Sequence, residues 1–407
     1  MPDKYGSSGD KTSAIVVGGG PAGLTAAITI AAGGINTVLV GKRPARPDNR
    51  TSFLVAGSVT ALSTLGVWDL CAAQAAPLKI MRIVDDTGRL WRAPEVKFDA
   101  VEIDLDAFGY NIENRHLVAA LEQFAGALRN LRIVDDEVEA VEPGADDVTV
   151  ALKSGKRLQA PLVIGADGRR SLCRAAAGIG MDEREYKQVA LTVSFKHTRA
   201  HRDCSTEFHT PSGPFTLVPL PGNRSSLVWV LDLIHADEIA ALDDDALSVE
   251  IEHASHSILG KIKLDQGRGL FPLGVATAKR FADNRIALVG EAAHVIPPIG
   301  AQGLNLGLRD AATIGELAIE AQRDGRDIGS ADVLGAYDKM RRADVGTRTL
   351  AIDFLNRTLL TGLLPVQGMR GLGLYLLDRL GPLRRAAMRE GLAPTAAQPK
   401  LMRGEAL

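Results

Sequence analysis

A glycine-rich turn between a buried strand and a helix constrains this chain more than any other feature. Residues 14–17, AIVV, are apolar and short enough for a buried strand, and the alanine-rich residues 21–32 continue with helical spacing. Gly33-Gly34 then ends the helix, and residues 36–42, NTVLVGK, supply a second strand. Because a strand–helix–strand unit brings its two strands together in parallel, we expect an α/β fold with a parallel sheet at the N-terminus.

The turn itself, GGGPAG, has the pattern of a site for a nucleotide pyrophosphate. Gly18 permits a tight turn, Gly20 lets the backbone approach a phosphate, and Gly23 allows the helix to pack on the strand. Ala22 belongs to the same predicted turn. Phosphates would meet free N–H groups at the positive end of the helix dipole. The alternative is a glycine-rich turn in an unrelated α/β fold.

The end of the second strand departs from the dinucleotide-binding pattern. An acid that holds the adenosine ribose is expected there, whereas this chain has Gly41 followed by Lys42 and Arg43. Glycine and basic residues can receive the 2′-phosphate of NADP. An NADP-dependent dehydrogenase is therefore a competing interpretation of this first motif.

Composition and charge exclude several other classes. The 407 residues carry a formal net charge of −2 and only 4% aromatic residues, so we expect no nucleic-acid partner. Cys71, Cys173 and Cys204 are odd in number and widely spaced, which indicates unpaired thiols in a reducing compartment. The polar N-terminus is unlike a signal peptide, and no apolar run has the length of a membrane span. We expect a cytoplasmic protein.

The rest of the chain alternates between two kinds of pattern. Strand-like segments dominate residues 80–99, which we expect to form a hairpin, and residues 187–270, which include an acidic helical interlude. Between them we expect a helix at 114–128 and three strands within 131–168. Strand, glycine-rich loop and helix return after residue 285. The predicted organisation is a discontinuous Rossmann-like nucleotide-binding domain at 10–78, 100–178 and 280–350, interrupted by a mostly antiparallel β-rich substrate domain at 79–99 and 179–279 and followed by a C-terminal helical segment at 351–407.

Two later motifs weigh against the dehydrogenase. Residues 162–174, LVIGADGRRSLCR, run from an apolar strand into a turn where Asp167 can approach a pyrophosphate-bearing loop. An ordinary Asx turn would use the same residue types. Residues 290–310, GEAAHVIPPIGAQGLNLGLRD, place four glycines and two adjacent prolines between a strand and a helix. We interpret this irregular backbone as a grip on a flat, electron-poor cofactor, since side chains would prevent so close an approach.

These segments together resemble a known family. GGGPAG, GADGRRSLCR and RIALVGEAAHVIPPIGAQGLNLGLRD occur in the order and approximate spacing of the three FAD motifs of group A flavoprotein monooxygenases. The implied fold is similar to that of 4-hydroxybenzoate hydroxylase. RTSFLVAGSVTALSTLGVWD, GYNIENRHLVAAL and the C-terminal FLNRTLL and LLPVQGMRGLGL resemble the UbiH/UbiF/Coq6-like hydroxylases of ubiquinone biosynthesis. The resemblance covers nearly the whole chain.

The resemblance implies a reaction and its reagents. The protein would be an FAD-dependent aromatic-ring monooxygenase that takes electrons from NAD(P)H and one oxygen atom from O2. Oxygen would reach the ring through a flavin C4a-hydroperoxide, and the substrate would be a polyprenylated phenol, a ubiquinone precursor. The flavin carries the difficult chemistry, and the protein supplies orientation, charge stabilisation and a dry pocket.

Individual residues acquire roles from the same resemblance. Backbone N–H groups around Gly303, Leu304 and Asn305 would face the pyrimidine edge of the flavin, where the reduced ring carries negative charge. Glu291 stands where the family has an aspartate that contacts the ribityl chain. The implied cofactor-binding residues are Gly18, Gly20, Ala22, Gly23, Arg43, Arg50, Arg115, Asp167, Gly290, Glu291, Gly300, Gly303, Leu304 and Asn305.

Two residues are candidates for the catalytic step. The Pro297-Pro298 pair would stiffen the wall where substrate meets flavin and leave the Pro298 carbonyl as a polar contact for a phenol. His294 could act as a general base on that phenol. Its position in Ala-Ala-His at a loop entrance favours a structural histidine instead.

Other interpretations of the sequence stay open. The protein could be another FAD oxidoreductase of a prenyl lipid, a reductase or oxidase, or a non-catalytic flavin- or lipid-binding subunit of a quinone biosynthesis complex. Leucines and arginines in the C-terminal segment fit either packing on the core or a peripheral contact with the inner face of the membrane. We expect no metal site, because the residues with ligand-like types lack a paired second half. Those residues are His197, His201, Cys204 and His209.

Overall fold

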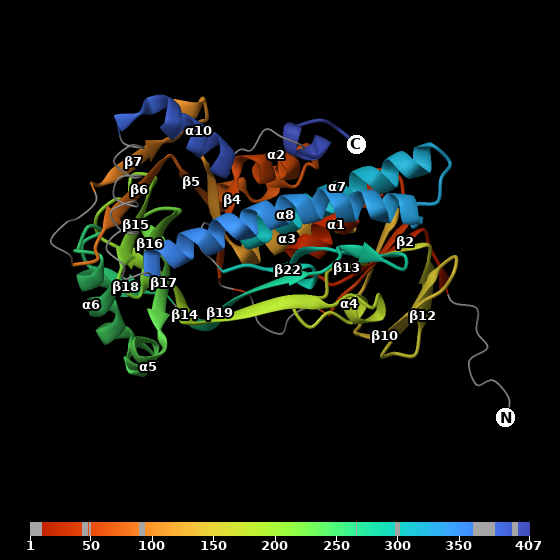
Figure 1. The fold of residues 1–407 in the computed structure, drawn as a ribbon, viewed down its shortest axis with the longest axis horizontal. Coiled ribbons are helices and arrows are strands. Elements are labelled where there is room, and N and C mark those ends of the chain that lie inside the picture. The colour runs from red at the N-terminus through yellow and green to blue at the C-terminus, as the bar shows by residue number, and fades with distance from the viewer. Residues whose placement is uncertain are drawn as a thin grey trace.

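The computed structural model describes residues 10–42, 48, 50–88, 94–265, 267–297, 302–360, 379–392 and 398–407. Figure 1 shows an elongated molecule with a helix-covered parallel sheet toward one end and a large β-sheet toward the other. Strand β14 (Met181–His197) and helix α8 (Ala331–Leu360) run along the length between them. The expected α/β fold with a β-rich insertion is confirmed.

The parallel sheet has six strands in the order β20-β21-β13-β2-β3-β9, of which only the edge strand β20 is antiparallel to its neighbour. Strand β2 lies at its centre, parallel to β3 on one side and to β13 on the other, and all its residues are buried. The predicted strand–helix–strand opening is confirmed, with α1 packed against both α3 and α7. The bounds are β2 Ala14–Val17, α1 Pro21–Ala32, β3 Thr37–Val40, α3 Asn114–Ala127, β9 Leu131–Val134, β13 Leu162–Gly165, β20 Ala282–Asp283, β21 Ile286–Leu288 and α7 Gln302–Arg323.

The large sheet has nine strands, in the order β22-β19-β14-β17-β16-β15-β6-β7, with β18 also paired to β14. One face packs its apolar side chains against α5 and α6. The hairpin predicted at 80–99 is present as the antiparallel pair β6 and β7. The bounds are β6 Ile80–Asp85, β7 Val96–Asp99, β15 Cys204–Thr210, β16 Gly213–Leu220, β17 Arg224–Asp232, α5 Leu233–Ala241, α6 Asp244–Ala254, β18 Ile262–Leu264, β19 Gly269–Ala278 and β22 His294–Val295.

Two smaller sheets complete the fold. A four-stranded sheet has the order β1-β12-β11-β10, and a three-stranded sheet has the order β4-β8-β5. Helix α2 (Ala56–Thr64) follows β4, and the short α4 (Leu172–Ala176) follows β13. The strand bounds are β1 Asp10–Lys11, β4 Thr51–Val55, β5 Ala75–Leu78, β8 Gly109–Glu113, β10 Val138–Pro143, β11 Val148–Leu152 and β12 Arg157–Ala160.

The prediction of three strands within 131–168 was wrong. Residues 131–143 form two strands, because β9 joins the parallel sheet while β10 turns away into the four-stranded sheet. Residues 148–160 form the hairpin of β11 and β12, and β13 follows in the parallel sheet, so the segment holds five strands in two sheets. The acidic interlude is likewise two helices, the second of which is capped by the Asp243 side chain. Apolar alternation predicts a strand but does not say which sheet it joins.

The C-terminal segment is helical where it is described. Helix α10 (Gly381–Leu392) buries Met388 against the short helix η3 (Ala100–Ile103), and Arg384 pairs with Glu102 at 2.6 Å. The chain then ends on η6 (Lys400–Arg403), packed against α2. Residues 361–378, which include part of the predicted tail helix, lie outside the described residues. Within the described part of the chain, no helix is both long enough and apolar enough to cross a membrane.

Candidate active site

Three loops leave the parallel sheet side by side. Val17, Gly165 and Leu288, the last residues of β2, β13 and β21, lie in register across the sheet. Backbone hydrogen bonds continue just past that edge, from Ala166 N to Val17 O at 2.7 Å and from Val289 N to Gly165 O at 2.9 Å. The chain crosses from β2 to β3 on one side and to β13 on the other. This edge is therefore the topological switch point, where open α/β sheets bind their ligands.

The first of these loops is built around glycines that cannot be replaced. Gly18 has a left-handed φ of 120°, and a Cβ there would overlap the carbonyl oxygen of Ala166. A Cβ on Gly23 would overlap the carbonyl oxygen of Gly18. Gly20 is different, because nothing lies within 4 Å of the position its Cβ would take. It begins α1 without a side-chain cap, so the N–H groups of the first turn are open to an external anion.

Gly41, where the adenosine-ribose acid would stand, lies against the first loop. A Cβ on Gly41 would lie 2.9 Å from Gly19 Cα and closer still to Gly19 N. An acidic side chain at this position would therefore require the glycine turn to shift. Lys42, which follows, donates to Glu137 at 2.7 Å on the surface. Arg43, predicted to contact the cofactor, lies outside the described residues.

Helix α7 begins beside the start of α1. A Cβ on Gly307 would lie 3.2 Å from Ala22 Cβ and 3.3 Å from Gly290 Cα, so the absence of a side chain lets the two helices and the third loop approach closely. Gly303 has open space around its Cβ position, as Gly20 does. The first turn of a helix carries N–H groups without intrahelical acceptors. Gly303 and Leu304 belong to that turn, and Gly300 lies outside the described residues.

Asn305 uses its side chain to hold β4. Its Oδ1 accepts from Val55 N at 3.0 Å, and its Nδ2 donates to Phe53 O at 2.8 Å. The residue is buried. The side chain is therefore a structural tie between α7 and β4, while the prediction for Asn305 concerned its backbone N–H.

A buried ionic cluster beneath the third loop was not assigned from the sequence. Asp310 Oδ2 accepts from Gly290 N at 2.9 Å and lies 2.6 Å from His294 Nε2, and Oδ1 accepts from Arg341 Nε at 2.6 Å. Burial alone would raise the pKa of Asp310, but the charges of His294 and Arg341 hold it below its usual value. Asp310 thus anchors the backbone of Gly290 to α7 and α8. Glu291, next to it, is exposed.

His294 is enclosed by this cluster. Its side chain has no exposed surface, and its Nε2 is turned to Asp310. Pro298, the other residue predicted to act on the substrate, lies outside the described residues. The cluster depends on Arg341 of α8, and nothing in the sequence places that helix against the third loop. The cluster therefore has no signal in the sequence.

Asp167 caps the short helix that follows its own loop. Its carboxylate accepts from Ser171 Oγ at 2.6 Å and from Cys173 N at 3.1 Å. Arg174 does not pair with it but donates to Ala292 O at 2.9 Å and to Arg169 O at 2.9 Å. The Arg174 contact ties the second loop to the third.

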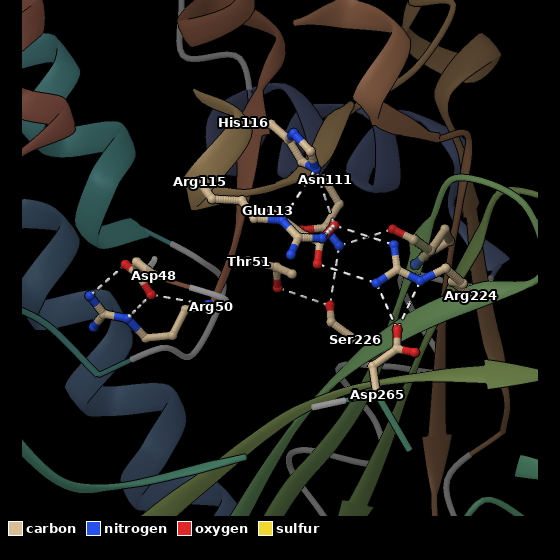
Figure 2. Close-up of polar contacts among 11 residues, drawn as sticks. Asp48, Arg50, Thr51, Asn111, Glu113, Arg115, His116, Arg224, Ser226 and Asp265 are labelled. Carbon is tan, nitrogen blue, oxygen red and sulfur yellow. Dashed lines mark hydrogen bonds and ion pairs between the residues drawn. The ribbon is translucent and has the colours of Figure 1, made fainter. Parts of the chain in front are cut away.

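The backbone of Arg50 meets the start of α3, where Asn114 N donates to Arg50 O at 2.8 Å, but the side chains of Arg50 and Arg115 lie in separate groups of contacts (Figure 2). Arg50 pairs with Asp48 at 2.8 Å and stands over the ring of Phe271 at 5.5 Å. The hydrogen bond with Asp48 raises the pKa of Arg50, and the charge of Glu291 adds a smaller contribution. Arg115 donates to Glu113 at 3.0 Å.

The ligand-like residues of the large sheet bind parts of the protein. His197 contacts Ser225 Oγ at 3.0 Å and Arg199 O at 2.8 Å, and His201 contacts Leu220 O at 3.0 Å. His209 pairs with Glu207. In the described part of the chain, no three His, Cys, Asp or Glu side chains gather in a metal-binding group.

Comparison with known proteins decides the family. The FAD binding domain family matches residues 11–351. The chain is 35% identical to ubiquinone hydroxylase UbiL of Rhodospirillum rubrum, over 98% of this chain and 94% of that protein. It belongs to the FAD-dependent hydroxylases. It is 34% identical to 3-demethoxyubiquinol 3-hydroxylase of Escherichia coli, over 94% of this chain and 98% of that protein.

The fold of this hydroxylase is shared with a solved monooxygenase. The p-nitrophenol 4-monooxygenase PnpA of Pseudomonas putida superposes with a TM-score of 0.79, at 20% identity, over 95% of this chain and all of that one. The resemblance to group A monooxygenases and their UbiH/UbiF/Coq6-like branch is confirmed, and the protein is an FAD-dependent monooxygenase. The competing dehydrogenase interpretation was wrong. The residue-by-residue roles and the domain boundaries stay predictions.

Proposed function

We propose that this hydroxylase acts on the ring of a polyprenylated phenol from ubiquinone biosynthesis, with NAD(P)H as electron donor. The names of the relatives support the substrate class, since both act on ubiquinone or its precursors by name. The observation that carries the proposal is the convergence of three loops and the start of α7 at one edge of the parallel sheet. A flat dinucleotide needs contacts of this kind along its whole length.

The described residues fit FAD. A phosphate pair would lie at Gly20, where space is open and the first turn of α1 is uncapped. The flavin ring would lie against the first turn of α7 at Gly303 and Leu304, with Glu291 toward the ribityl chain. Because Gly41 cannot carry an acid, backbone groups would hold the adenosine ribose. When bound, FAD would accept a hydride from NAD(P)H and activate O2 for the transfer of one oxygen atom.

One face of the large sheet supplies the substrate wall. Successive residues of a strand point to opposite faces, so Ser226 and Val228 share a face, and Val218, paired with Ser226, shares it too. Ser226 Oγ accepts from Asn111 Nδ2 of β8, so this face is turned toward the three-stranded sheet. Val218 and Val228 are only partly buried, and Phe271 is 38% exposed. An apolar wall of this kind suits a prenylated ring and excludes water from the oxygen transfer.

In this proposal His294 holds the third loop in place and does not contact the substrate. It is fully buried against Asp310, and Asp310 holds Gly290 N, so the pair would keep the third loop at its distance from the flavin. Phenol activation would then depend on the substrate's own electron density and on the Pro298 carbonyl. A general base at His294 would need a rearranged loop.

The experiment is an oxygen-labelling assay. Purified protein reconstituted with FAD is supplied with a short-chain prenylated phenol, NADH or NADPH, and 18O2. Mass spectrometry should find one 18O atom in the product. Reduced nucleotide consumed without label in any product would favour an oxidase or reductase. No phenol-dependent consumption at all would favour a non-catalytic subunit.

The residues at α10 support the expected peripheral contact with a membrane. Leu380 and Leu383 are 48% and 46% exposed beside this helix, while its Arg384 and Arg389 pair with Glu102 and Asp104. Flotation with liposomes, compared between the full chain and a Leu380→Ser, Leu383→Ser variant, tests the contact. Pull-down with the other enzymes of quinone biosynthesis tests membership of a complex.

A further inference from the structure

A polar network joins the cofactor side of the protein to the large sheet (Figure 2). Arg224, at the start of β17, donates to both carboxylate oxygens of Glu113 at 3.2 Å. The same guanidinium donates to Asp265 at 2.7 and 2.9 Å. The Glu113 side chain is only 6% exposed and Arg224 is 23% exposed. Bidentate contacts of this geometry fix orientation as well as distance.

A second layer of hydrogen bonds lies two residues along each strand. Asn111 Nδ2 donates to Ser226 Oγ at 3.1 Å and to Pro219 O at 2.9 Å. Thr51 Oγ1 donates to the same Ser226 Oγ at 3.0 Å. Strand β8 is therefore tied to β17 at two successive levels, and Arg224 forms the charged one. The other level also includes β4 through Thr51 and β16 through Pro219.

The other side of Glu113 leads to the residues predicted to contact the cofactor. Glu113 accepts from Arg115 at 3.0 Å, and the next amide, Asn114 N, donates to Arg50 O at 2.8 Å. Burial alone would raise the pKa of Glu113, but Arg224 first and then Arg115 hold it below its usual value. The Glu113 carboxylate is therefore ionised. It contacts both Arg224 of the large sheet and Arg115, in the segment that also meets Arg50.

We propose that Arg224 is a positioning residue for the oxygen transfer. By bridging Glu113 and Asp265 it sets the large sheet, and the ring held against it, at a fixed place relative to the Arg50–Arg115 segment on the flavin side. The inference rests on the monooxygenase activity of the family and not on which phenol is used. A displacement of the ring by about 1 Å can cost up to about a hundredfold in rate, and the reaction has a competing outcome.

The competing outcome makes the role measurable. In the coupled reaction, NAD(P)H, H+, O2 and the phenol give NAD(P)+, water and the ring with one added oxygen. In the uncoupled reaction, NAD(P)H, H+ and O2 give NAD(P)+ and H2O2, with the ring unchanged. A ring held away from the oxygen, or water admitted at the junction, diverts electrons to H2O2 without slowing their entry.

The test uses Arg224→Lys in the full-length, FAD-loaded enzyme. Lysine keeps the charge but cannot bridge two carboxylates in a planar fork. We expect FAD content and unfolding temperature near those of the unsubstituted enzyme, and product per NAD(P)H lowered about threefold or more, with H2O2 accounting for the difference. Arg82→Lys is the matched control, since Arg82 donates to Thr206 within the same sheet. It should leave coupling unchanged.

Glu113→Gln provides the second arm. If Glu113 acts through Arg224, the double variant should be no more uncoupled than the worse single variant. Unchanged coupling in Arg224→Lys overturns the proposal, as does a loss that only follows the loss of FAD. Equal uncoupling in Arg82→Lys also overturns it. An unsubstituted enzyme that oxidises no NAD(P)H would instead contradict the proposed electron donor.

Discussion

The side-chain amide of Asn305, in the first turn of α7, donates to the backbone carbonyl of Phe53 in β4 at 2.8 Å, across 252 residues of chain. Its oxygen accepts from Val55 N at 3.0 Å. The buried Asn305 side chain therefore holds the start of α7, which is predicted to face the flavin, against β4. Strand β4 in turn contacts the large sheet through Thr51 and Ser226.

Loss of the Asn305 amide should loosen the cofactor as well as the fold. In Asn305→Ala, the Val55 N–H and the Phe53 carbonyl lose their partners, at about 1–3 kcal/mol for each buried group left unsatisfied. We expect a lower unfolding temperature and faster release of FAD, measured by flavin fluorescence on dilution. Asn130→Ala is the control, because the Asn130 side chain also makes two hydrogen bonds to distant backbone, donating to Ala31 O and Ile35 O, but at the opposite ends of the parallel strands. Equal FAD release by the two variants would contradict the assignment.

Methyl groups added at Gly20 and Gly303 should distinguish the cofactor cradle from the fold. Among the described residues, no atom of a neighbouring segment lies within 4 Å of either Cβ position, so each alanine variant should fold as the unsubstituted chain does. Each methyl would occupy the space through which the backbone approaches FAD, so we expect at least about tenfold weaker binding, or about 1.4 kcal/mol. Isothermal titration with FAD measures this.

The matched control for those glycines is Gly126→Ala. Gly126 lies on an exposed part of α3 with equally open space around its Cβ position. It should bind FAD normally. Full FAD affinity in both Gly20→Ala and Gly303→Ala would show that the dinucleotide does not lie along these two turns.

Asp310→Asn should destabilise the protein strongly. Replacing a carboxylate oxygen by an amide nitrogen places a donor against Gly290 N or Arg341 Nε and leaves Arg341 without its buried counter-charge. Removing one partner of a buried pair costs about 3–5 kcal/mol. Urea denaturation measures this. Asp324→Asn, at an exposed pair with Arg326, should cost about 0–1 kcal/mol.

The same carboxylate should contribute to acid sensitivity. The pKa of Asp310 is lowered in the folded protein, so its stabilisation is fully present above the pKa of the unfolded chain, about 3.9. This stabilisation is lost as the pH falls from about 3.9 through the lower pKa that Asp310 has in the folded protein. The difference in unfolding free energy between the unsubstituted chain and Asp310→Asn should shrink across that acidic range. A difference that stays constant or grows toward low pH would contradict the lowered pKa.

The thiols should be unreactive in the native enzyme. Burial raises the pKa of Cys71 to about 11, and that of Cys173 is raised well above its usual value, chiefly by burial. A thiol with a pKa of about 11 is only about 0.1% thiolate at pH 8. Ellman's reagent should label at most Cys204 quickly in the folded chain and all three thiols in urea. Rapid labelling of two thiols in the native Cys204→Ser variant would show that the core opens.

Much of the cofactor side could be predicted from local sequence because its signals are local. The strand at 14–17, the glycine turn and the helix at 21–32 are neighbours in the chain, and the resemblance to the FAD motifs pointed to the family that the comparisons confirmed. The strands within 131–168 were assigned too simply, since each strand's sheet depends on a distant partner. The Asp310 cluster and the Arg224 bridge were missed for the same reason.

The glycine turn and the apolar strands of this protein could be read from the sequence, because their requirements lie within a few consecutive residues. The side chains that support this backbone could not, because they come from distant segments that meet only in the folded chain. Asn305 meets Phe53, Asp310 meets Arg341, and Glu113 meets Arg224 across 111 residues, all through contacts between segments far apart in the chain. Packing and the burial of charge determine which side chains pair in this way, so no local sequence pattern predicts these contacts.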